Sequence, residues 1–171
     1  MRNLVLCLSI ITFALAAQAA PNATLFGGYQ YTRFDTSTNS NGSALLFGTG
    51  VGANGWNAAL TGGFNSWLGI RADVAAAYPN GFNFYTYTAG PELSIRLPIV
   101  RPFAHALFGL ARATSYGTVS NGFATMIGGG VDLGHGILAW RLAQFDWMYT
   151  RFNGISNNRN IRICTGQVIR L

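Results

Sequence analysis

Alternation of polar and apolar residues, sustained over whole segments, is the feature that most restricts what this chain can fold into. Between residues 84 and 97 the even positions after Phe84 carry Thr, Gly, Glu, Ser and Arg, whereas the odd positions carry Tyr, Ala, Pro, Leu and Ile. A similar period of two runs through residues 56–65, 68–78 and 124–133. Successive side chains of a strand point to opposite faces, so this period predicts strands rather than helices.

The composition favours a chain of many short strands that is not an ordinary cytosolic domain. Only 9% of the residues are charged, against roughly a quarter in soluble domains. All 11 basic residues are arginine, and the formal net charge is +6. Soluble surfaces are normally rich in lysine and glutamate, and strands are rich in aromatic residues, which make up 13% here. The length favours one domain.

The first residues are typical of a secretory signal peptide. A positive start at Arg2 precedes an apolar stretch from Leu4 to Ala17, and a small-x-small cleavage motif ends at Ala19. A transmembrane anchor is the alternative, but this stretch is shorter than the roughly 20 residues that span a bilayer. We predict a signal peptide at 1–19 and one domain at 20–171. The mature chain then keeps one cysteine, Cys164, which excludes an internal disulfide.

Eight segments with strand character are separated by turn signals, and no later apolar run is long enough for a membrane-spanning helix. The segments are 24–34, 54–65, 67–78, 82–96, 101–114, 123–134, 137–152 and 159–171. Long polar connections at 35–53, 115–122 and 153–158 alternate with tight turns. This arrangement predicts an all-β fold, an eight-stranded antiparallel up-and-down transmembrane β-barrel, with both termini at the tight-turn, periplasmic side of a bacterial outer membrane.

Charged residues in the middle of the predicted strands decide which face is inside. They are too few to solvate the outside of a barrel, but they suffice to fill an eight-stranded lumen with ion pairs. We therefore predict a polar interior and a lipid-facing apolar wall. The near balance of their charges favours a plugged lumen. The predicted interior ion network consists of Arg71, Asp73, Glu92, Arg96, Asp132, Asp146 and Arg162.

Two of the predicted strands have an ambiguous register. In 137–152, Arg141 falls on the same parity as the aromatic residues, which requires either a bulge or a position near the lipid headgroups. In 101–114, His105 and Arg112 differ in parity.

The carboxyl-terminal residues carry a family resemblance. Gly166, Ile169 and Leu171 resemble the assembly signal of bacterial outer-membrane barrels, in which hydrophobic residues follow a glycine at three and five positions. That signal usually ends in an aromatic residue, where this chain has leucine. Together with 26–31, 55–57 and 102–106, the pattern resembles small OmpA-like or opacity-type barrels such as those of acidobacterial genomes, over nearly all of 22–171. The resemblance implies a fold, a membrane and the barrel-insertion machinery as a partner, and it implies no reaction.

Four further arginines lie near strand ends that the deduced topology places at the outer rim: Arg33, Arg112, Arg151 and Arg159. The guanidinium group pairs with phosphate oxygens through two parallel hydrogen bonds. Our hypothesis is that these arginines contact phosphates of lipopolysaccharide in the outer leaflet. The alternative is unspecific placement of long cationic side chains at an interface.

No constellation of residues predicts an enzyme. Residues 50–55 match G-x-G-x-x-G, but the following residues have strand character, whereas a dinucleotide site needs a helix there. Neither His105 nor His135 has the serine two positions later that the outer-membrane lipid A deacylases carry. Asp73 and Glu92 have arginines nearby, which favours ion pairing over acid-base chemistry. We expect no metal, no cofactor and no nucleic acid.

Three functions remain open at this stage. A structural or surface-interaction barrel with a plugged interior and extracellular loops is the one we favour. A narrow pore for solutes or ions would need more room than eight strands leave. A secreted lipocalin-like barrel would need an apolar interior.

Overall fold

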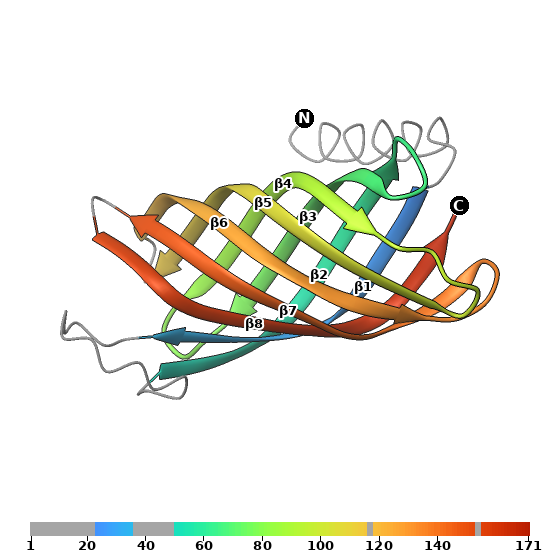
Figure 1. Ribbon diagram of the computed structural model, residues 1–171. Coiled ribbons are helices and arrows are strands. Elements are labelled where there is room, and N and C mark those ends of the chain that lie inside the picture. Colours follow the sequence, from blue (N-terminus) through green and yellow to red (C-terminus); the bar gives the residue numbers. More distant parts are fainter. Residues whose placement is uncertain (1–22, 36–49, 116–117, 153–154) are drawn as a thin grey trace, which may run out of the picture.

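Eight antiparallel strands in chain order close into one barrel, which confirms the predicted fold class (Figure 1). The computed structural model describes residues 23–35, 50–115, 118–152 and 155–171. The predicted signal peptide lies outside the described residues, as does most of the predicted loop at 35–53. The strands are β1 (Ala23–Asp35), β2 (Gly50–Gly63), β3 (Leu68–Tyr78), β4 (Asn83–Ser94), β5 (Val100–Ser115), β6 (Thr118–Leu133), β7 (Leu138–Phe152) and β8 (Ile155–Arg170).

The barrel closes where β1 pairs with β8. The ladder runs from Thr24 opposite Arg170 to Arg33 opposite Ile161. Near its centre Gly28 faces Gly166, and a Cβ atom on either glycine would collide with the backbone of the other strand. Small residues at this pair therefore let the two strands approach closely enough to complete the closure.

The two ends of the barrel differ from the prediction. We call the end where β1 begins and β8 finishes the inner end, and the opposite end the outer end (Figure 1). The predicted long connections at 115–122 and 153–158 are wrong. The β5–β6 ladder continues to Ser115 opposite Thr118, and the β7–β8 ladder to Phe152 opposite Ile155. Polar residues that resemble a loop in sequence form strand here because the ladder satisfies their backbone groups and both faces can remain in water.

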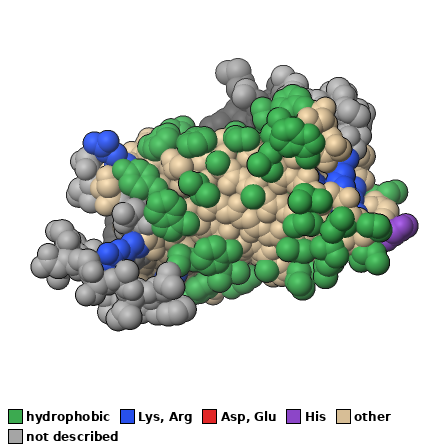
Figure 2. All heavy atoms as spheres, viewed as in Figure 1, with side chains coloured by type: hydrophobic (Ala, Val, Ile, Leu, Met, Phe, Trp, Pro, Cys, Tyr) green, Lys and Arg blue, Asp and Glu red, His purple; other side chains and the backbone are tan. Residues whose placement is uncertain are grey.

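The outer wall is apolar along most of its height. Figure 2 shows hydrophobic side chains spread over the wall and positive charge only towards the two ends. Large side chains in the wall include Ile127, Phe145 and Trp147, which are about half exposed. Such an exterior suits lipid far better than water. No helix in the described part of the chain is long and apolar enough to cross a membrane.

The interior has two layers of different chemistry. The layer towards the inner end contains the buried charges. The layer towards the outer end is an apolar cluster that includes Phe34, Phe84, Leu107, Met126 and Met148. The rings of Phe34 and Phe84 meet edge to face, with centroids 4.9 Å apart. The prediction of a polar interior therefore holds for only one layer, because Phe34, Phe84 and Leu107 share inward parity with polar residues.

Candidate functional site

The centre of the buried charge cluster is Asp73, which lies between two arginines. Its Oδ2 is 3.0 Å from Nη2 of Arg71, and its Oδ1 is 2.9 Å from Nη1 of Arg162. Arg162 also donates from Nε to Oδ2 of Asp146 at 2.7 Å. All four side chains are fully buried. They reach one another because β8 and β3 both turn alternate residues into the same narrow lumen.

A second group continues the cluster towards the inner end. Glu92 accepts from Nη1 of Arg71 at 3.3 Å and from Nη2 of Arg101 at 3.0 Å. Sequence reasoning missed Arg101 because it stands at the first residue of a predicted strand, where the pattern gives no parity to test. The signal that could have identified it is its spacing: Arg101, Phe103 and His105 are alternate residues and therefore lie on the same face of the strand.

A bulge turns Arg141 inward, which resolves its ambiguous register. The ladders of β7 shift between Arg141 and Gln144 and, opposite it on β6, between Val131 and Asp132. Arg141 thereby pairs with Asp132 at 2.7 Å, and its guanidinium lies 4.2 Å from the ring centroid of Phe103. The other ambiguous strand is regular, with His105 inward and Arg112 outward.

Arg96 is the one predicted member that lies outside the cluster. It follows the end of β4 and occupies the turn at 95–99, with an exposed side chain. Arg96 was predicted to lie inside the buried network, and its exposed side chain at the end of the lumen corrects that placement. Arg96 is an even-numbered residue, like the inward-facing residues of β4, but β4 ends two residues earlier, at Ser94. Its side chain therefore lies at the inner end of the lumen and not in the layer of buried charges. Arg71 and Arg101 are the residues that pair with Glu92.

The buried charges balance and bridge the lumen. The interior ion network as observed pairs Arg71, Arg101, Arg141 and Arg162 with Asp73, Glu92, Asp132 and Asp146.

Gln144 accepts a hydrogen bond from Nη2 of Arg71 at 3.0 Å. These residues belong to β3 and β7, which are four strands apart around a ring of eight and so lie on opposite walls. Polar contacts therefore cross the full width of the barrel.

The outer arginines, Arg33, Arg112, Arg151 and Arg159, share one level and one direction. Arg33 is the eleventh residue of β1, Arg112 the thirteenth of β5 and Arg151 the fourteenth of β7, counted from the inner end. Arg159 is the twelfth residue of β8, counted from Arg170. A barrel strand crosses the bilayer in roughly 9–11 residues. All four alternate with buried inward residues, so they face outward at the upper limit of that height or just above it.

Three of the outer arginines are on consecutive strands around the closure. Arg151, Arg159 and Arg33 belong to β7, β8 and β1. In contrast, the acidic side chains that the structure describes, Asp73, Glu92, Asp132 and Asp146, are all buried in the lumen. The outer arginines thus lie on the wall, whereas these four carboxylates lie inside the lumen.

The predicted assembly signal occupies the last part of β8. Gly166 faces the lumen at the closure, whereas Ile169 and Leu171 lie on the outer wall with partly exposed side chains.

The described residues offer little for catalysis or metal binding. His105 is buried, with Nε2 2.9 Å from Oδ1 of Asp146 inside the ion network. His135 is exposed in the turn after β6. The residues of the G-x-G-x-x-G match begin β2, so a strand follows the glycines. No group of three His, Cys, Asp or Glu side chains in the described part could hold a metal ion.

Comparison with known proteins places this fold among small outer-membrane barrels. No family model and no curated protein matches the sequence. Among solved structures, neisserial surface protein A (NspA) is 14% identical with a TM-score of 0.67, over 87% of this chain and 96% of that one.

Two further solved structures agree. Ail, the attachment invasion locus protein of Yersinia pestis, is 17% identical with a TM-score of 0.52, over 88% of this chain and 98% of that one. The N-terminal barrel domain of Pseudomonas aeruginosa OprF is 10% identical with a TM-score of 0.56, over 89% and 99%. The expected resemblance to OmpA-like and opacity-type barrels is thus confirmed as a likeness of fold.

Proposed function

We propose that this protein is an outer-membrane barrel with a structural or surface-interaction role, whose outer arginines bind phosphates of lipopolysaccharide in the outer leaflet. In this proposal the segment 1–19 directs export to the periplasm. Gly166, Ile169 and Leu171 then form the signal that the barrel-insertion machinery reads.

The observation that carries the proposal is the common level of the outer arginines. They stand where the strands leave a bilayer of ordinary thickness, which is the height of the phosphate groups of lipid A. Their guanidinium groups suit bidentate pairing with phosphate, and outward orientation makes lipid, rather than the lumen, the partner within reach.

The lumen is proposed to be closed and without catalytic activity. Two features support closure: the ion network that bridges opposite walls, and the apolar cluster between that network and the outer end. The buried position of His105 among charged partners supports a structural role for the residue. A narrow pore, the alternative, would have to pass both layers.

The test compares lipopolysaccharide binding between two pairs of arginine variants of equal charge. Arg112→Ser with Arg151→Ser removes two outer arginines, and Arg96→Ser with Arg170→Ser removes two arginines at the inner end. Each chain is folded into vesicles with and without lipopolysaccharide, after which retained lipopolysaccharide and thermal stability are measured. A difference in gel mobility between boiled and unboiled samples shows that each variant is folded.

We expect the wild type and the inner pair to retain lipopolysaccharide and to gain thermal stability from it, and the outer pair to lose much of both. Replacement of all four outer arginines by serine should abolish the gain. Unchanged retention and stability in the fourfold variant would refute the proposal. Because one solved structure holds Ail in complex with the heparin analogue sucrose octasulfate, that compound serves as a competing anion in the same assay.

A further inference from the structure

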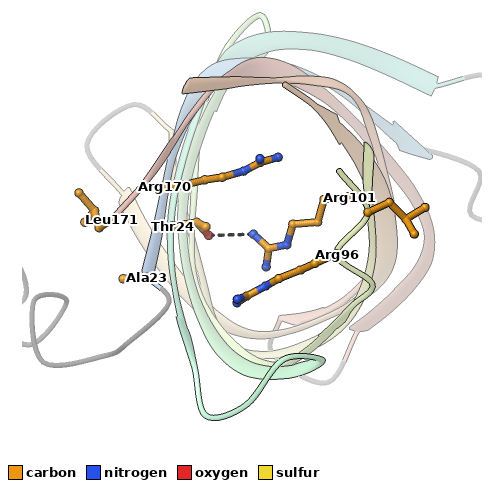
Figure 3. Close-up of a pocket in the computed structure, with 7 residues that line it drawn as sticks. Ala23, Thr24, Arg96, Arg101, Arg170 and Leu171 are labelled. Carbon is orange, nitrogen blue, oxygen red and sulfur yellow. Dashed lines mark hydrogen bonds between the residues drawn. The ribbon is translucent and has the colours of Figure 1, made fainter. Parts of the chain in front are cut away.

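A small pocket opens at the inner end of the lumen, on the opposite side of the ion network from the apolar cluster. Its volume is about 140 Å³. Figure 3 shows Arg96 and Arg101 pointing into this opening from one side of the wall and Arg170 pointing into it from the opposite side. The lining residues are Ala23, Thr24, Arg96, Leu97, Arg101, Arg170 and Leu171.

Every charged side chain that lines the pocket is an arginine. Glu92 compensates Arg101 from the deeper side, but it also binds Arg71, and the remaining buried acids bind other arginines. Arg96 and Arg170 bring two more guanidinium groups to the same mouth. Burial and then the positive charges of Arg101 and Arg170 lower the pKa of Arg96. The guanidinium groups of Arg101 and Arg170 are therefore close enough to repel that of Arg96.

The pocket also has unused hydrogen-bonding capacity. Arg101 is 6% exposed, and its Nη2 binds Glu92 and Ser94 while its Nη1 is 3.5 Å from Oγ1 of Thr24. Arg170 donates from Nη1 to the main-chain oxygen of Gly134 at 3.2 Å. The buried Nε atoms of both arginines have no acceptor in the described part of the chain. A buried charged donor without an acceptor is costly, and an anion in the pocket would relieve that cost.

We propose that this inner mouth is a binding site for a phosphate group, held by Arg96, Arg101 and Arg170. Three planar guanidinium forks suit a tetrahedral oxyanion, which can accept several charge-assisted hydrogen bonds at once, whereas chloride offers no such geometry. The pocket is open at the end of the lumen, so a phosphate group can enter it while the rest of the molecule that carries it stays outside. This site lies at the opposite end from the outer arginines and is independent of the function proposed for them.

Two sources could supply the phosphate group, a soluble phosphate compound or a lipid headgroup of the inner leaflet. Inorganic pyrophosphate serves as the soluble probe, titrated calorimetrically into the folded barrel in uncharged detergent, with sodium chloride used to hold ionic strength constant. Phosphatidylglycerol doped into the same micelles serves as the lipid probe, followed by its ³¹P resonance.

The variants isolate the site. Arg96→Gln with Arg170→Gln removes the two arginines that line the pocket outside the buried ion network. It keeps the ion pair between Arg101 and Glu92. The control, His135→Gln, changes an exposed turn residue at the same end of the barrel and leaves every arginine in place. A gel-mobility difference between boiled and unboiled samples establishes that each variant is folded.

We expect saturable pyrophosphate binding with one site per chain in the wild type and the control. The inner pair should bind at least about tenfold more weakly, since each arginine contributes a charge-assisted hydrogen bond. A ³¹P shift that the inner pair abolishes would identify lipid as a source, and pyrophosphate binding without such a shift would identify a soluble one. Absence of saturable binding to either probe would overturn the proposal, as would equal weakening in the inner pair and in His135→Gln.

Discussion

Replacement of Arg162 by methionine tests whether the interior ion network stabilises the barrel. Arg162 is fully buried and reaches two carboxylates: Asp73 from Nη1 at 2.9 Å and Asp146 from Nε at 2.7 Å. Methionine has similar length but no charge, so the change leaves the lumen filled and removes the cation. Asp73 keeps Arg71 at 3.0 Å, whereas Asp146 keeps only Gln144 and His105 among its described contacts.

The expected cost follows from the uncompensated charge. Removal of one partner from a buried ion pair costs about 3–5 kcal/mol, because the other charge stays buried. Because Asp73 and Asp146 keep other partners, we expect Arg162→Met to cost an amount at the lower end of this range, about 3 kcal/mol. Addition of Asp146→Asn removes the uncompensated charge, so the double variant should be more stable than the single one.

Urea unfolding in phosphatidylcholine vesicles, followed by tryptophan fluorescence, measures these free energies. Arg112→Met is the matched control, since it changes the same residue type at an exposed site, and we expect a shift within about 0.5 kcal/mol. If Arg162→Met also unfolds within about 1 kcal/mol of the wild type, the ion network does not stabilise the barrel.

Three other predictions concern the closure of the barrel, its apolar wall and its lumen. Gly166→Ala should destabilise the barrel by about 1–3 kcal/mol in the same unfolding assay, because the new Cβ meets the backbone of β1. Gly27→Ala, where a Cβ has open space, should be neutral, and equal effects would contradict the close approach at the closure. Ile127→Arg on the wall should cost about 2–4 kcal/mol in vesicles, whereas His135→Arg in a turn should not; a harmless Ile127→Arg would place the wall in water. In planar bilayers we expect no single-channel steps from the wild type, and regular steps would show that the two interior layers do not close the lumen.

Strand character and facing are the parts of the fold that local sequence could predict. The pleat fixes alternate sides for successive residues, so the inward position of Arg71, Asp73 and Glu92 follows from parity within two segments. No distant contact is needed for that inference. Strand ends were harder, since Ser, Thr and Asn near 118 and 156 suit both a loop and a water-exposed ladder.

The members of the ion network were predicted only where parity was regular. Arg141 needed the bulge beside Gln144 to face the lumen, and a bulge appears only when two strands are aligned. Arg96 had the right parity but lies past the end of β4. Neither outcome can be read from one segment by itself.

The sequence by itself therefore determined that the chain forms strands, how many there are, and which face of most of them is charged. These properties depend on the two-residue repeat of an extended backbone and on the scarcity of charge. Only the tertiary structure decided which charges meet. Closure of eight tilted strands brings β3 opposite β7, so that Arg71 reaches Gln144 across 73 residues of sequence. It also gathers Arg96, Arg101 and Arg170 around one pocket, because the β4–β5 hairpin and the end of β8 meet at the inner end.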